Sequence, residues 1–185
     1  MISENIPRLH GEKVCLTLFR TDEKAVQKYL RWMSDETTCV FIERNNTVVD
    51  DTFMAGWLTC NDALRFNICD AECEDMIGYC HIDHRAKQGA AWLSINIGES
   101  MMRGKGYGTD VVKVLLKYCF EELAVASVHL DVLETNEGGI KCYEKCGFQI
   151  TGRYRKHHIH EGKNIDWLHM DILLEEWEEL QRHDG

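Results

Sequence analysis

The chain of 185 residues has the length of one domain, because single cores typically serve roughly 100 to 200 residues. Hydrophobic residues make up 44% and charged residues 28%, a balance that can bury a core without disulfides or metals. The formal net charge of -10 argues against nucleic-acid binding, which requires clustered Lys and Arg, and favours cationic partners. We therefore predict a single domain over residues 1–185 with one active site and no nucleic-acid partner.

Targeting signals and cysteine usage indicate the compartment. The N-terminus, Met1 to Pro7, lacks a basic start followed by an apolar run, and no later apolar stretch approaches the ~20 residues of a membrane span. The nine cysteines are odd in number, scattered and mostly embedded in apolar segments, which is typical of reduced thiols. We expect a cytoplasmic protein with no membrane association and no structural disulfides.

The first half of the chain mixes short strands with two helices. Strand-favouring residues fill Lys13 to Phe19, and a helix follows with an N-cap within Thr21 to Lys24. A second helix is expected near Asp50 to Leu58, inside the least legible segment of the chain, Cys39 to Asn61. Three more strands are then expected at Leu64 to Cys69, Met76 to Ile82 and Ala91 to Ile97, with the acidic turn Asp70 to Asp75 at an exposed hairpin tip.

The second half alternates helices and strands after a glycine-rich turn. A helical pattern begins at Gly106, Ser127 to Leu133 returns to a strand, and Asn136 to Lys145 is a short helix. Two further strands, Phe148 to Ile159 and Ile165 to Leu173, are predicted to form an antiparallel pair. The glutamate run that follows is typical of a solvated helix face.

The sharpest motif is the segment Arg103 to Thr109, Arg-Gly-Lys-Gly-Tyr-Gly-Thr, which follows a strand and opens a helix. At such a junction the backbone N–H groups lack partners, the helix dipole adds positive potential, and glycines let a diphosphate approach the main chain. The spacing matches neither a P-loop nor a dinucleotide-binding Gly-x-Gly-x-x-Gly motif. The alternative is a glycine turn that only caps the helix.

Two segments resemble the GNAT acyltransferases. Arg103, Gly106 and Gly108 form an Arg-x-x-Gly-x-Gly pattern that looks like the pyrophosphate loop of this family. Asn136 to Phe148 resembles its Asn-x-x-x-Ile-x-x-Tyr-Glu-Lys-x-Gly-Phe signature, in the expected order. The resemblance extends from about Gly78 to Leu174, and its closing part is similar to the subgroup of ribosomal-protein and spermidine N-acetyltransferases.

The resemblance implies a fold and a cofactor site. The fold is α/β (α+β), with a mixed, mostly antiparallel central sheet that is flanked by helices and splayed at a cleft for acetyl-CoA. Backbone groups of Ile95 to Ile97 would pair with the pantetheine arm and polarise the thioester carbonyl, and such donors stabilise an oxyanion. The residues that it places at acetyl-CoA are Ile95, Asn96, Ile97, Arg103, Gly104, Lys105, Gly106, Tyr107, Gly108, Thr109 and Asn136.

Tyr143 is the candidate catalytic residue that the resemblance implies. A phenol can protonate the departing CoA thiolate without being ionised at neutral pH, and the amine would attack the thioester directly. The alternative for Tyr143 is a core aromatic residue, and the alternative for Asn136 is a helix cap. The general base could be a carboxylate, a histidine or a water chain, and the sequence does not identify it. Asp131, Glu134 and Glu99 lie on or just after the relevant strands, where acids are more often solvated than catalytic, and relatives often carry an acid where this chain has Trp92.

Two histidine-rich segments are tempting as metal ligands. His81 and His84, like His157 and His158, would point to opposite faces of a strand, because successive side chains alternate. The cysteine pairs of this chain also lack a Cys-x-x-Cys spacing. We therefore expect no metal.

Three functions remain open from the sequence. The first is an N-acetyltransferase that acts on a primary amine of a small cationic molecule such as a polyamine or an aminoglycoside, which the acidic composition favours. The second is a protein N-terminal or lysyl acetyltransferase with a peptide acceptor, and the third is a noncatalytic acyl-CoA sensor. An exposed strand near the C-terminus would also allow pairing across a homodimer.

Overall fold

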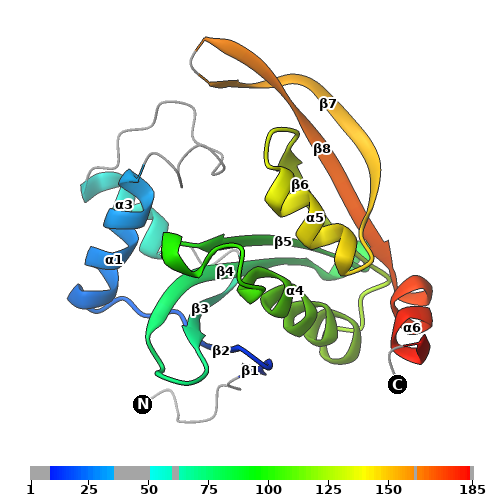
Figure 1. Ribbon diagram of the computed structural model, residues 1–185, viewed down its shortest axis with the longest axis horizontal. Helices are drawn as coiled ribbons and strands as arrows, with labels where there is room; N and C mark the ends of the chain where they lie inside the picture. The colour runs from blue at the N-terminus through cyan, green and yellow to red at the C-terminus, as the bar shows by residue number, and fades with distance from the viewer. Residues whose placement is uncertain (1–8, 36–50, 60–62, 161, 184–185) are drawn as a thin grey trace.

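An eight-stranded sheet organises the part of the chain that the computed structural model describes, which is residues 9–35, 51–59, 63–160 and 162–183 (Figure 1). The strand order is β1-β2-β3-β4-β5-β6-β8-β7, and every neighbouring pair is antiparallel except β5 with β6. The strands are β1 (Leu9–His10), β2 (Val14–Leu18), β3 (Leu64–Asp70), β4 (Met76–Arg85), β5 (Ala90–Ile97), β6 (Ser127–Leu133), β7 (Gln149–His160) and β8 (Lys163–Leu173).

The helices lie on both faces of this sheet. The described α-helices are α1 (Glu23–Ser34), α3 (Asp51–Thr59), α4 (Tyr107–Lys117), α5 (Glu137–Lys145) and α6 (Leu174–His183). A π-helical turn, Tyr118–Glu122, extends α4, and short 3-10 turns occur at Ala86–Gln88 and Ser100–Met102. Among the described residues, no helix combines the length and the apolar character that crossing a bilayer requires.

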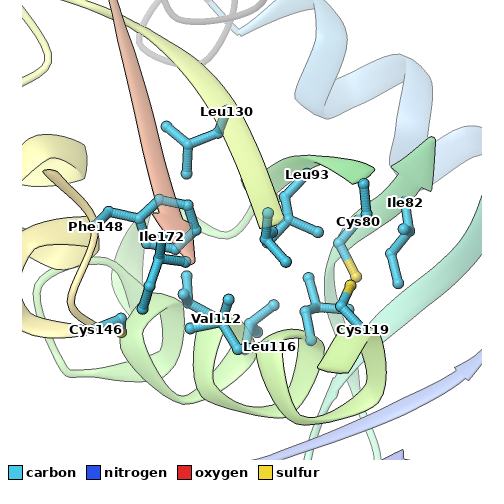
Figure 2. Close-up of a cluster of buried hydrophobic side chains, with 14 of the residues drawn as sticks. Cys80, Ile82, Leu93, Val112, Leu116, Cys119, Leu130, Cys146, Phe148 and Ile172 are labelled. Carbon is cyan, nitrogen blue, oxygen red and sulfur yellow. The ribbon is translucent and has the colours of Figure 1, made fainter. Parts of the chain in front are cut away.

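The main core lies between the sheet and α4 (Figure 2). Val111, Val112, Leu115 and Leu116 recur at helical spacing on α4, so that one stripe of the helix is fully buried. The strand residues that meet this stripe alternate along their strands, which sends every second side chain to the same face. The labelled strand members of this core are Cys80, Ile82, Leu93, Leu130 and Ile172.

A second, aromatic core lies on the opposite face, under α1 and α3. Asp22 caps α1 by accepting a hydrogen bond from the backbone of Ala25 at 3.3 Å, as the N-cap prediction requires. Tyr29 and Trp32 of this helix are buried against Tyr79 of β4. The sheet therefore separates two cores, and α1 reaches the sheet close to the end of β5.

The structure confirms the predicted mixed, mostly antiparallel sheet flanked by helices, and the helix expected near Asp50 to Leu58 is α3. The remainder of Cys39 to Asn61 lies outside the described residues. The acidic turn differs from the prediction at one end. Asp70 ends β3 and is buried rather than exposed. Its buried carboxylate is satisfied by hydrogen bonds from two backbone N–H groups of the turn and from the hydroxyl of Tyr107.

Candidate active site

The parting of β5 from β6 creates the candidate site. These parallel strands pair only between Ala90–Trp92 and Ser127–His129, and beyond Trp92 no strand pairing joins the remainder of β5 to β6. A cavity of about 450 Å³ lies next to this part of β5. It is lined by β5, the turn before α4, the first turns of α4, and α5: Ile95, Asn96, Ile97, Arg103, Gly104, Gly106, Gly108, Thr109, Val112, Asn136, Gly138, Gly139, Lys141, Cys142, Tyr143 and Lys145.

The glycine-rich turn lies at the N-terminus of α4 and on the cavity. Gly106 precedes the first helical residue with φ of +90°, a left-handed conformation that side chains other than glycine rarely adopt. A Cβ atom added to Gly108 would meet only the sulfur of Cys142, at 3.5 Å, so packing inside the protein does not require a glycine there. The missing side chains instead leave the N–H groups of the first helical turn open to a ligand in the cavity, which suits an anion.

Two carboxylates hold this helix start in place. Asp110 is buried and accepts backbone hydrogen bonds from Glu12 at 3.2 Å, Lys13 at 2.8 Å and Val14 at 3.0 Å, which ties α4 to the beginning of β2. Tyr107 donates its hydroxyl to Asp70 at the end of β3. This hydrogen bond lowers the pKa of Asp70 and raises the pKa of Tyr107 to about 12, so the pair is a carboxylate and a neutral phenol at neutral pH.

Nine of the eleven residues expected at acetyl-CoA line the cavity, and Lys105 and Tyr107 do not. Tyr107 is turned to Asp70, while the carbonyl of Lys105 accepts a hydrogen bond from Nζ of Lys13 at 2.9 Å. Arg103 lines the cavity, but its guanidinium also donates to the carbonyls of Ile97 at 2.9 Å and Gly98 at 3.3 Å. These two hydrogen bonds join the end of β5 to the glycine-rich turn.

Tyr143 lies on the cavity side of α5, facing the region of β5 and α4. It is half-buried and packs edge to face against Phe148, with ring centroids 5.9 Å apart. Burial raises the pKa of its hydroxyl above the ordinary value of 10.0, so the side chain stays protonated at neutral pH. The ring of Tyr143 thus packs on the core while the residue also lines the cavity.

Asn136 caps α5 and also lines the cavity. Its Oδ1 accepts a hydrogen bond from the backbone N–H of Gly139 at 2.9 Å, which makes it the N-cap of α5. It lines the cavity as well, so capping and ligand contact are compatible.

Comparisons with known proteins decide the family. Residues 10–149 match the family described as the acetyltransferase (GNAT) domain. The chain belongs to the GNAT acetyltransferase family. The fold agrees, since the spermidine N-acetyltransferase of Vibrio cholerae, solved in complex with CoA and spermine, superposes with a TM-score of 0.74 at 22% identity, over 88% of this chain and 97% of that one. A GNAT-family acetyltransferase of Bacillus anthracis gives a TM-score of 0.76 at 17% identity, over 91% and 99%.

Curated relatives within the family match shorter stretches. The prophage-derived N-acetyltransferase YokL of Bacillus subtilis is 33% identical over 76 residues, which are 41% of this chain and 43% of that protein. The spermine/spermidine N(1)-acetyltransferase of the same species is 27% identical over 84 residues, 42% of this chain and 55% of that protein. The chain thus spans about half the length of these curated relatives.

The general base of this GNAT chain is not identified by the cavity. None of the three candidate carboxylates, Asp131, Glu134 and Glu99, is among the described residues that line it. Each is already engaged by side chains: Glu99 by Arg31 and Trp32, Glu134 by Arg153, and Asp131 by His169.

Two basic residues of the cavity were missed by the sequence analysis. Lys141 and Lys145 lie on α5 and line the cavity opposite the glycine-rich turn. Their spacing of four places them on one side of the helix, a signal that was available in the sequence. They add two positively charged side chains to the lining of the cavity.

Proposed function

We propose that this protein is an N-acetyltransferase that transfers the acetyl group of acetyl-CoA to a primary amine of a small cationic molecule, by direct attack of the amine. One observation carries the proposal: Tyr143, the glycine-rich N-terminus of α4 and the unpaired end of β5 line the same cavity. An anion site, a strand edge and a proton donor are the three groups that binding and cleaving a CoA thioester require.

Different residues of the cavity would bind different parts of acetyl-CoA. The N–H groups at the start of α4, with Lys141 and Lys145 of α5, suit the diphosphate of the cofactor. Beyond Trp92 the edge of β5 is released from β6, so its backbone groups are available to amides of an extended ligand such as the pantetheine arm. Glycines at the turn fit this ligand, because a side chain there would fill the space that a phosphate needs.

Tyr143 would act as the general acid. Acetyl-CoA supplies an acyl carbon activated by a thiolate leaving group, and that thiolate needs a proton when the carbon–sulfur bond breaks. The raised pKa of Tyr143 keeps the proton on its Oη until that step. Within the described part of the chain, no side chain or backbone group is hydrogen-bonded to this hydroxyl, so the leaving group would not have to displace a partner.

The acceptor would reach the thioester from the face covered by α1 and α3. Asn96, at the cavity, donates its side-chain amide to the hydroxyl of Tyr79 at 3.1 Å, and Tyr79 belongs to the aromatic core of that face. The net charge of -10 attracts cations, and the polyamine acetyltransferases among the similar proteins support a polyamine acceptor. We further propose one cytoplasmic domain over residues 1–185, with β7 as the sheet edge available for a homodimer.

A turnover assay with an acceptor panel tests this function. Acetyl-CoA consumption is measured with spermidine and spermine, an aminoglycoside, and peptides with a free N-terminus or a lysine. We expect turnover with a polyamine or an aminoglycoside. Turnover with the peptides alone would assign a protein acetyltransferase, and tight acetyl-CoA binding without turnover across the panel would assign an acyl-CoA sensor, so either result contradicts the proposal.

A further inference from the structure

A cluster of polar side chains lies on the sheet face opposite α4, where β5, β6 and β8 meet. Val128, Leu130, Met170 and Ile172 point from β6 and β8 into the main core, so the residues that alternate with them lie on the other face. Those residues are His129 and Asp131 on β6, and His169 and Asp171 on β8. The register pairs His129 with Asp171 and Asp131 with His169, which brings all four together.

Three of these side chains converge. Nδ1 of His129 lies 3.3 Å from Nε2 of His169 and 3.9 Å from Oδ2 of Asp171, an oxygen that also accepts a hydrogen bond from Thr151 at 2.7 Å. The side chains are one-fifth exposed or less, at 17% for His129, 20% for His169 and 20% for Asp171. In the described part of the chain, these are the three residues whose ligand atoms lie close enough together to hold a metal ion.

Hydrogen bonds to the outer ring nitrogens, Nδ1 of His169 and Nε2 of His129, determine whether the two nitrogens inside the cluster carry a proton or a lone pair. Nδ1 of His169 lies 2.7 Å from Oδ1 of Asp131, and because a carboxylate only accepts, this nitrogen carries the proton. Nε2 of a neutral His169 therefore carries a lone pair that points into the cluster. Nε2 of His129 lies 2.7 Å from Oγ of Ser127, and since a hydroxyl can donate or accept, His129 can adopt either tautomer.

The two tautomers correspond to two uses of the cluster. With its proton on Nδ1, His129 donates to His169 and completes a hydrogen-bonded chain from Ser127 to Asp131. With its proton on Nε2, His129 turns a second lone pair toward that of His169. These two nitrogens and the carboxylate of Asp171 could then serve as three metal ligands. A tetrahedral zinc ion with zinc–nitrogen distances of ~2.0–2.1 Å separates two nitrogen ligands by ~3.3 Å, which equals the spacing of the two histidine nitrogens.

We propose that His129, His169 and Asp171 form a binding site for a divalent transition metal of the zinc class, with a fourth position left to water. Two imidazoles favour such an ion over Mg²⁺ or Ca²⁺, which prefer oxygen ligands. The hydrogen bonds from Asp131 and Ser127 match the outer contacts that fix the orientation of metal-binding histidines. The proposal is independent of the acyl-transfer function, and it departs from the expectation, drawn from other histidines, that the protein binds no metal.

The location suggests a structural consequence. His129 stacks on Trp92 of β5 with ring centroids 4.5 Å apart, and these two residues form the last paired position before β5 and β6 part. A metal held by β6 and β8 would therefore tie two strands together at the point where the cavity begins.

Zinc titration of the full-length protein tests the site. Calorimetry and metal analysis after gel filtration measure the stoichiometry of wild type, His129→Gln, Asp171→Asn and the control His183→Gln, whose exposed histidine lies on α6. All four proteins are kept reduced and retain the same cysteines, so zinc bound to thiols is common to them. We expect wild type and the control to bind one equivalent more than His129→Gln and Asp171→Asn.

Two further measurements prevent an ambiguous result. Asp131→Ala keeps the three ligands and loses the outer hydrogen bond, so its zinc affinity should fall by roughly 10- to 100-fold without loss of stoichiometry. Crystals soaked in zinc should show anomalous density between the three side chains. Equal zinc stoichiometry and affinity in wild type and folded Asp171→Asn would overturn the proposal, as would anomalous density only at cysteines.

Discussion

The two faces of the sheet carry sites that differ in how far apart their residues lie in the sequence. On the face of α4 and α5, which we call the motif-built face, the cavity is built from a few continuous stretches, and the largest of them is α5 with its cap, Asn136 to Lys145. On the opposite face, His129 and His169 meet although 40 residues separate them. The first kind of site is visible in the sequence because neighbours in the chain remain neighbours in space. The second arises only from strand pairing.

The largest effect should come from Tyr143, the proposed proton donor on the motif-built face. Tyr143→Phe keeps the ring against Phe148 and removes the hydroxyl, so kcat should fall by about 100- to 10,000-fold with little change in acetyl-CoA affinity. Tyr118→Phe is the matched control, because Tyr118 is a half-buried tyrosine outside the cavity. Initial rates under conditions where chemistry limits turnover measure the effect. Wild-type turnover in a Tyr143→Phe variant with an unchanged Tm would exclude the assignment.

The second effect tests whether the motif-built face depends on a distant segment. Asp110→Ala would leave the backbone N–H groups of Glu12, Lys13 and Val14 without their acceptor, so the free energy of unfolding should fall by roughly 2 to 4 kcal/mol. Glu121→Ala, an exposed acid on the π-helical turn, should change it by no more than about 0.5 kcal/mol. Urea denaturation measures both. A loss below about 1 kcal/mol for Asp110→Ala would show that the helix start does not need this anchor.

The third effect concerns cofactor binding at the glycine-rich turn. Gly108→Val should weaken acetyl-CoA binding at least roughly tenfold, or ~1.4 kcal/mol, because the side chain would enter the cavity rather than the core. Gly108 gives a cleaner test than Gly106, whose φ of +90° would add backbone strain to any substitution. Gly56→Val on α3, where no atom lies within 4 Å of the added Cβ, is the control. If calorimetry finds equal affinities for folded Gly108→Val and wild type, phosphates do not bind at this turn.

Local sequence patterns predicted most of the fold. The buried stripe of α4, the cap at Asp22 and the alternation along β5 each arise within one short segment, and the strand and helices predicted from them are confirmed. The parting of β5 and β6 was inferred from the family resemblance instead, because strand order and register are properties of the whole chain.

For the candidate site, the segments that form it were predicted, but the orientation of individual side chains was not. The segments around Gly108 and Tyr143 were found because glycine spacing and the signature are local patterns. The orientation of Tyr107 was not, because it depends on Asp70 at the end of β3. Charge and position in a motif do not determine which way a side chain turns when a distant partner is available.

The smallest effect tests whether Asn136, which caps α5, also contacts the cofactor on the motif-built face. Asn136→Ala removes the cap of α5 and should lower the free energy of unfolding by about 1 kcal/mol. Asn136→Asp keeps an acceptor for the N–H of Gly139, so stability should stay within about 0.5 kcal/mol of wild type. Its acetyl-CoA affinity should nevertheless fall by roughly 2- to 10-fold, because the amide donor is replaced by a carboxylate at the edge of the cavity.

Urea denaturation and calorimetry on the same preparations distinguish these roles. A residue that only caps the helix would give Asn136→Asp both wild-type stability and wild-type affinity, and any loss of affinity would then appear only in the destabilised Asn136→Ala. Loss of affinity in a stable Asn136→Asp has no explanation in capping, since the hydrogen bond to Gly139 is kept. That outcome would place the amide nitrogen of Asn136 against the cofactor, and the motif-built face would then use one side chain for both folding and binding.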